Sequence, residues 1–168
     1  MNKPENDKQN DGWDSLSDQV KADLILQIFK ELSMVKNHVR LLVLVTHGFM
    51  ELLINVLIDH HMKNRKKIFI DEIAYPQSTR LLILNELGIL DDAEYKVFGW
   101  FGTLRYDAIH KPIFEITGAD LSHVSPEEFR DPSNFYNLCI DIIGGFWNRH
   151  ASVFGPRLST GAVGSRRK

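Results

Sequence analysis

The chain lacks the residues and motifs that mark several well-known classes of protein. It has one cysteine in 168 residues, so no disulfide can form within it. It also has no glycine-rich phosphate loop, no dinucleotide fingerprint and no HExxH pattern. These absences exclude a disulfide-stapled domain and leave no sequence support for a nucleotide-binding enzyme or a zinc protease.

The single cysteine, Cys139, stands in the apolar run YNLCIDII. Nothing around it marks an electropositive setting, so we interpret it as a small core residue rather than a thiol nucleophile. One cysteine and the absence of a signal peptide favour a cytoplasmic location.

The net charge of the chain is small, at −2, but its charged residues are unevenly distributed. Acidic residues are absent after Asp141, whereas that stretch contains Arg149, Arg157, Arg166, Arg167 and Lys168. A second basic cluster follows His60 and His61 and consists of Lys63, Arg65, Lys66 and Lys67. Such clusters can contact phosphates, although solvated loop and tail charges are the simpler interpretation of each.

The length and the hydrophobic content of 43% predict one domain with a real core. We expect a disordered leader over 1–12, a helical domain over 13–154 and a flexible basic tail over 155–168. Apolar spacing predicts an all-α bundle of about five or six helices. The main helices are expected at about 15–33, 35–63, 78–87, 91–110 and 132–150, with a loop over 63–77 that includes a short strand or turn at 68–70. A short helix should begin at SPEEF, with Pro126 in its first position.

The second predicted helix is apolar enough to resemble a membrane span. A polar stripe of His47, Glu51 and Asn55, four residues apart, favours a buried bundle helix instead, and we expect no membrane contact. His47 and Glu51 could also be metal ligands. A complete site needs further ligands, so we interpret them as a hydrogen-bonded pair and expect no metal or other cofactor.

The segment from Ser78 to His110 is the most informative part of the chain. It predicts a helix capped by Ser78 that stops at Gly88, and then a helix that begins at Asp91-Asp92. Because proline disfavours the α region for the residue before it, Lys111-Pro112 should end the second helix near His110. The negative end of the helix dipole then favours a protonated His110. Arg105 lies about 140° away around that helix, at about 3.6 residues per turn, so the two side chains need help to converge.

The fourth predicted helix is apolar on more than one side, through Tyr95, Phe98, Trp100 and Phe101. Gly99 and Gly102 would let another helix approach closely. We therefore expect a homodimer that forms through this helix.

The stretch from Val39 to His110 resembles the HEPN superfamily, whose members are all-helical and include RNA-cleaving toxins and defence nucleases. The resemblance rests on the long apolar helix with Glu51, the phrase RLLILNELGILDDAEY and the Arg-x4-His pair of Arg105 and His110. From Ser78 to Phe114 the chain is most similar to the mannitol operon repressor branch of that superfamily. The branch shares RL, LG, EY, LR and the terminal histidine at the same spacings.

The resemblance implies metal-independent RNA cleavage in a cleft shared by two protomers. His110 would move the proton of a ribose 2′-hydroxyl or of the leaving oxygen, Arg105 would hold the scissile phosphate, and Glu51 would orient one of them. We also expect substrate contacts from the neighbouring polar side chains Tyr106, Asp107, His47 and Lys111.

The chain departs from the HEPN nuclease pattern at two positions, and two other interpretations of the same residues stay open. Nuclease members usually carry a small polar residue where this chain has Tyr106, and antitoxin-modified members carry a tyrosine where it has Pro112. The repressor branch instead implies a non-enzymatic transcriptional regulator that acts through protein partners. A purely structural alternative is that Arg105 and His110 close the helix end by pairing with Asp107, Glu51 or terminal carbonyls. Direct DNA binding is not expected, because no helix carries a base-reading cluster.

Overall fold

The computed structural model of the protein describes residues 24–71 and 73–159. Within them the chain is all-α, as predicted, and no strand occurs. A helical segment covers residues 24–34. The helices that follow are α2 (Val39–His61), α3 (Arg65–Ile70), α4 (Gln77–Glu86), α5 (Asp92–His110), α6 (Phe135–Arg149) and α7 (Ala151–Ser159), with two short 3-10 turns, Glu127–Arg130 and Pro132–Asn134, before α6. The predicted leader, Trp13 and the last nine residues lie outside the described ranges.

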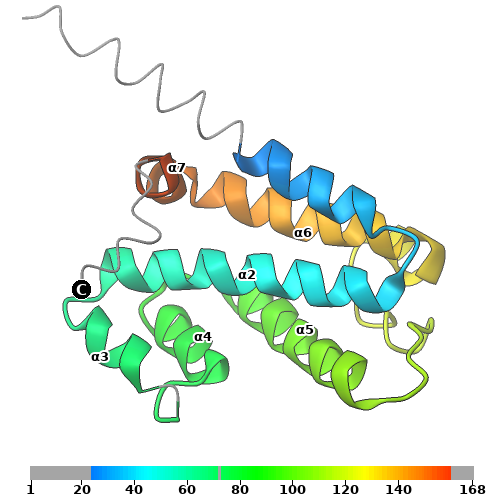
Figure 1. Ribbon diagram of the computed structural model, residues 1–168, viewed down its shortest axis with the longest axis horizontal. Coiled ribbons are helices and arrows are strands. Elements are labelled where there is room, and N and C mark those ends of the chain that lie inside the picture. Colours follow the sequence, from blue (N-terminus) through cyan, green and yellow to red (C-terminus); the bar gives the residue numbers. More distant parts are fainter. Residues whose placement is uncertain (1–23, 72, 160–168) are drawn as a thin grey trace, which may run out of the picture.

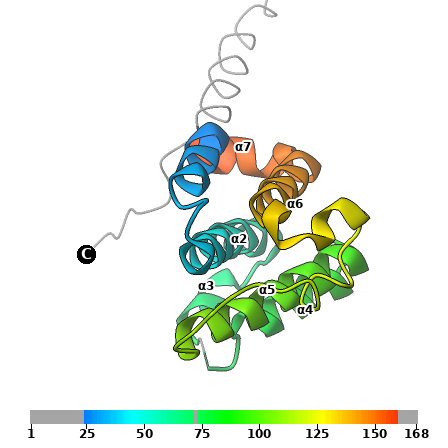
Figure 2. The same ribbon diagram turned by 90° about the vertical axis from the view of Figure 1, so that its right-hand side faces the viewer.

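Helix α2 is the centre of the fold (Figures 1 and 2). Helices α3, α4 and α5 lie on one side of it, and residues 24–34, α6 and α7 lie on the other. This central position explains the apolar sequence of α2, since Leu42, Leu53 and Leu57 are at most 1% exposed. By length and composition α2 could cross a membrane, but 56% of its most apolar window is buried inside the protein, which is consistent with a soluble protein.

The turn from α4 to α5 follows the sequence signals closely. Gly88 adopts a φ of 67°, a left-handed conformation that costs a glycine little, and its N–H donates to the carbonyl of Asn85 at 2.8 Å. Asp91 then caps α5. Its side chain accepts from the N–H of Glu94 at 2.8 Å, and the Glu94 carboxylate accepts from the N–H of Asp91 at 3.1 Å. These contacts fix where α5 begins.

The predicted cap of α4 is wrong. Pro76 occupies the N-cap position and no side chain caps the helix, so Ser78 lies one residue inside it. Pro126 likewise precedes its short helix instead of opening it.

Two segments that were predicted as loop or tail are helical. Residues 65–70 form α3, not a loop or strand, with Ile68 buried at 8% exposure. Helix α7 continues to Ser159, past the expected boundary at residue 154, and Phe154 is fully buried. In both cases contact with the core adds a stabilisation that local sequence signals do not carry.

The last long helix, α6, runs unbroken through Gly144 and Gly145. A Cβ at Gly144 would lie 3.4 Å from the ring of Phe29, so this glycine permits the close approach of the segment 24–34. Cys139 is fully buried on α6, and burial raises the pKa of its thiol to about 12, which confirms its reading as an inert core residue.

Candidate functional site

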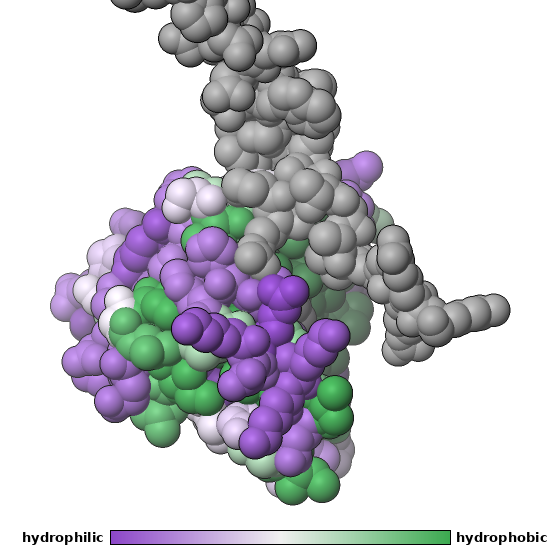
Figure 3. Space-filling view, turned by 90° about the vertical axis from the view of Figure 1, so that its left-hand side faces the viewer, coloured by the Kyte–Doolittle hydropathy of each residue, from purple (hydrophilic) through white to green (hydrophobic). Residues whose placement is uncertain are grey.

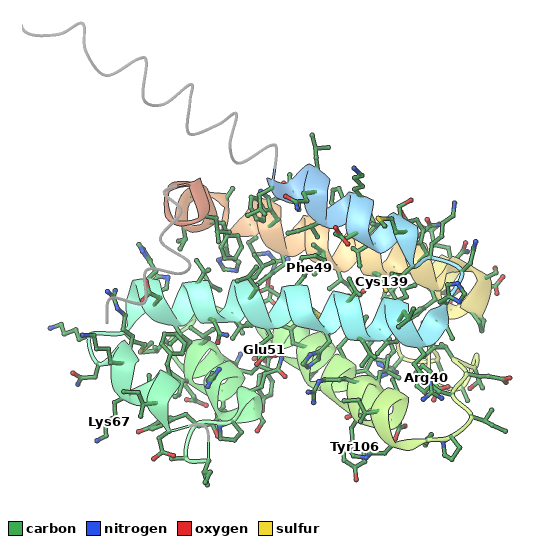
Figure 4. All side chains as sticks on the ribbon, in the orientation of Figure 1. Arg40, Phe49, Glu51, Lys67, Tyr106 and Cys139 are labelled. Carbon is green, nitrogen blue, oxygen red and sulfur yellow. The ribbon has the colours of Figure 1, made fainter. Side chains whose placement is uncertain are left out.

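The second half of α5 presents Arg105 and Tyr106 at the edge of an open cavity of about 550 Å³. The other wall comes from the start of α4, through Pro76, Gln77 and Ser78. Both α5 side chains are exposed, Tyr106 by 61%. Figure 4 shows Tyr106 projecting outward from α5, away from α2. Helix α5 therefore carries a guanidinium and a phenol ring at the edge of one open cavity.

His110 joins this surface through Tyr106. The centroids of their two rings lie 4.3 Å apart, with an angle of 47° between the ring planes. His110 is exposed and is the last residue of α5, as predicted. Arg105, Tyr106 and His110 thus form a row along the end of one helix, in which Tyr106 contacts the ring of His110 and lines the same cavity as Arg105.

Neither Arg105 nor His110 makes a hydrogen bond or an ion pair with any part of the chain that the structure describes. The structural alternative from the sequence, in which this pair closes the helix end, is therefore wrong for residues 24–71 and 73–159. Their polar groups are available to a molecule from outside.

The end of α5 is closed by Arg40, from α2. Its guanidinium donates to the carbonyls of Ala108 at 3.0 Å, Lys111 at 2.9 Å and Pro112 at 2.9 Å, and lies 6.0 Å from the centroid of the Phe114 ring. A cation at these unsatisfied carbonyls is the favourable arrangement at a helix C-terminus.

This role of Arg40 was not predicted from the sequence, although the helical spacing of α2 contained a signal for it. Arg40 precedes His47 by seven residues, about two helical turns, so it lies on the same side of α2 as the polar stripe.

Asp107 and Lys111, both expected to contact substrate, bind each other. Lys111 Nζ lies 2.8 Å from Asp107 Oδ2, one helical turn away, and the hydrogen bond and negative charge of Asp107 raise the pKa of Lys111. The pair sits on the exposed end of α5 beside His110, where Lys111 is exposed.

His47 lies beneath this surface, because only 2% of it is exposed. Burial lowers its pKa most, and the positive charge of Arg105 lowers it further, while a side-chain contact from Gln77 and the negative charge of Glu51 raise it. Its Nε2 is buried without a hydrogen-bond partner in the described residues. His47 is therefore electrostatically coupled to Arg105 but has almost no surface to offer a substrate.

Glu51 points from α2 toward the layer of α4 and α5 (Figure 4) and is partly exposed. Among the described residues no hydrogen bond joins it to Arg105, His110 or His47. The expected His47–Glu51 hydrogen bond is thus not found there. The structure brings Glu51 close enough to His47 to act through its charge.

A second buried contact on the same stripe was not foreseen. Arg80 of α4 is only 6% exposed, donates to Asn55 Oδ1 at 3.0 Å and lies 5.6 Å from the centroid of the Phe69 ring. No carboxylate pairs with Arg80 in the described part of the chain. The polar stripe of α2 therefore faces polar side chains of α4 and α5.

The basic cluster after α2 is exposed at one end of the molecule, and Figure 3 shows long hydrophilic side chains over that end. Arg65 is held by Asp59, with 2.8 Å between Nε and Oδ1, while Lys63, Lys66 and Lys67 make no ion pair in the described ranges. In those ranges no three His, Cys, Asp or Glu side chains are placed to hold a metal ion.

Comparison of the chain with protein families, with curated proteins and with solved structures gave no match.

Proposed function

We propose that α5 presents an RNA-binding surface and that two copies of it cleave RNA without a metal, as in toxin or defence proteins of HEPN type. The supporting observation is the row of Arg105, Tyr106 and His110, all of which are exposed. The guanidinium of Arg105 and the imidazole of His110 make no hydrogen bond or ion pair in the described chain. The protein would act in the cytoplasm.

Each group in the row has chemistry that suits RNA. The planar guanidinium of Arg105 can donate two parallel hydrogen bonds to a phosphate. An exposed tyrosine ring such as Tyr106 is a platform on which an unpaired base stacks. An imidazole at His110 can take the proton of a 2′-hydroxyl or give one to the leaving oxygen.

A second copy of the chain would complete the site, because one histidine cannot serve as base and acid in the same displacement. Helix α5 offers a face for that copy. A Cβ placed at Gly99 or Gly102 would meet nothing within 4 Å, and Ile109 is 47% exposed next to Tyr106. Such an open, partly apolar helix face suits a symmetric helix contact.

The test is incubation of the purified full chain with labelled RNA in EDTA. We expect cleavage that survives chelation and that falls by about 100-fold or more in Arg105→Ala and in His110→Ala, a typical cost for losing a charge-stabilising or proton-transfer group. His38→Ala, an exposed histidine outside the row, is the matched control and should cleave like the wild type. RNA left intact by the wild-type protein under every condition contradicts cleavage.

A non-enzymatic regulator that binds a protein partner is the second candidate. It is favoured by exposed apolar side chains at the end of α5, where Tyr106, Ile109 and Ile113 are 61%, 47% and 82% exposed. In this case RNA stays intact, and a charge at Ile109 disrupts the partner complex without loss of fold.

A further inference from the structure

A second open hollow lies at the junction of α2 and α3, away from the row on α5. It has a volume of about 750 Å³ and is lined by the consecutive residues Asp59–Lys67. Four of these nine residues are lysine or arginine, and Asp59 is the one acid among them. The lining therefore carries a surplus of three positive charges before any charge on its two histidines is counted.

Arg65 has a structural role at the end of α2. Its Nε lies 2.8 Å from Asp59 Oδ1, and its guanidinium donates to the backbone carbonyl of Asp59 at 3.1 Å. This one side chain offsets the acid of the lining and satisfies a carbonyl in the last turn of α2. The lysines of the hollow are not needed for either task.

Lys63, Lys66 and Lys67 are the lysines of the hollow. All three are exposed, and none forms a hydrogen bond or an ion pair with residues 24–71 or 73–159. Ile68 is the buried residue that holds α3 against the core, so the lysines occupy the part of α3 and of the preceding turn that faces solvent. Three like charges within five residues repel one another, and an anion bound among them would relieve that repulsion.

Two exposed apolar side chains near the hollow bear on the kind of anion. Ile70 and Ile73 are 83% and 96% exposed, and an apolar pair beside lysines is also a feature of proteins that lie on anionic membranes. The carboxylate of Asp71 stands between them in the chain, where it accepts from the N–H of Ala74 at 2.9 Å. An anionic bilayer repels this carboxylate, and insertion of the two isoleucines would draw it out of water. A flexible strand of phosphates can contact the lysines alone.

The hollow lies within reach of the α5 cavity. Lys67 and Tyr106 are on the same side of α2 (Figure 4), and α3 ends six residues before Pro76, which lines that cavity. The chain between Lys67 and Pro76 spans at most about 26 Å, at about 1.5 Å per helical residue and about 3.6 Å per extended residue. Single-strand sites commonly cover about 4–16 nucleotides, so one strand can contact both places.

We infer that the lysines of the hollow hold the phosphodiester backbone of an RNA strand beyond the bond that is cleaved. The inference rests on the proposed function, since the strand is the one that Arg105 and His110 would cleave. The lysines would add affinity without base preference, because contacts to phosphate carry no sequence information. Each phosphate that they neutralise on a single strand should contribute about −0.7 to the slope of log K against log salt concentration.

The experiment measures binding of the full chain to a fluorescein-labelled single-stranded DNA of about 20 nucleotides, longer than a typical site. Anisotropy is recorded in EDTA at a series of salt concentrations. DNA lacks the 2′-hydroxyl, so the proposed chemistry cannot cleave it. Lys63→Gln, Lys66→Gln and Lys67→Gln combined should weaken binding by about tenfold or more at low salt and reduce the slope by about 2, as expected for three phosphate contacts.

The matched control removes the same charge elsewhere. Lys30→Gln, Lys36→Gln and Lys96→Gln combined replace three exposed lysines outside the hollow and should bind the strand like the wild type. Thermal melts of both triple variants should show that they fold. With labelled RNA, the variant of the hollow should raise KM and leave kcat unchanged, because its lysines do not touch the reacting atoms.

The inference is overturned if the variant of the hollow keeps the affinity and slope of the wild type, or if the control variant loses as much. It is also overturned if the lysines of the hollow are needed to bind vesicles of phosphatidylserine and phosphatidylcholine but not to bind the strand. Strand binding that depends on these lysines in a protein that leaves RNA intact contradicts only the proposed cleavage, so the two proposals fail separately.

Discussion

Arg40 and Ala108, 68 residues apart in the chain, are joined by a 3.0 Å hydrogen bond from the guanidinium to the carbonyl. The same guanidinium reaches the carbonyls of Lys111 and Pro112, so one side chain of α2 fixes the end of the helix that carries His110. The position of the proposed site on α5 therefore depends on a residue outside it.

Arg40→Ala should lower the free energy of unfolding by about 1–3 kcal/mol, because three carbonyls lose a charge-assisted donor. Urea denaturation measures this loss. Arg40→Lys should recover part of it, since an ammonium keeps the charge but not the planar fork. A loss below about 0.5 kcal/mol in Arg40→Ala would contradict a capping role, because that is the scale of ordinary surface substitutions.

The stability of the protein should fall as the pH is lowered below 6.5, the ordinary pKa of histidine. Burial and the charge of Arg105 lower the pKa of His47 in the folded state, so below pH 6.5 the unfolded chain binds more protons and unfolding is favoured. Denaturation at a series of pH values measures this slope. His47→Gln should flatten it, whereas His60→Gln, an exposed control, should leave it unchanged.

The pKa of His47 should respond in opposite directions to two neighbours. Arg105→Gln removes a positive charge and should raise it, while Glu51→Gln removes a negative charge and should lower it. Titration of the His47 ring by NMR measures both shifts. Equal shifts of the same sign would mean that the substitutions act through unfolding or repacking instead of through charge.

Asn55→Ala should destabilise the protein by about 1–3 kcal/mol, because it removes the side-chain acceptor that the buried Arg80 guanidinium uses within residues 24–71 and 73–159. Asn55→Asp keeps an acceptor and should lose less. Thermal or urea unfolding distinguishes them. If Asn55→Ala unfolds like the wild type, the 3.0 Å contact contributes nothing to stability.

The protein should sediment as a dimer if α5 is the contact between two copies. Gly102→Glu places a charge on the open face of α5, at a position where an added Cβ meets no heavy atom within 4 Å, and should shift the protein to the mass of one copy. Asn148→Glu on α6 is the matched control and should remain dimeric. If the wild-type protein sediments as a monomer at every concentration, the predicted dimer is wrong and no active site can be shared between two copies.

The helices whose ends are marked by capping, glycine or proline residues could be predicted from the sequence. The cap at Asp91, the left-handed Gly88 and the Lys111-Pro112 stop each act within a few residues, so the bounds of α5 could be read from the chain. Helices α3 and α7 could not be read, because they are short and are stabilised by burying Ile68 and Phe154 against other elements.

For the site, the sequence was enough to predict that Arg105, Tyr106 and His110 share the end of one helix. Which polar groups have partners became visible from the packing of the helices: Arg40 caps the end of α5, His47 is buried, and Arg105 and His110 make no hydrogen bond or ion pair in the described chain. The physical reason is that helix periodicity places a side chain on a face, whereas its burial and hydrogen bonds depend on the helix that packs against that face.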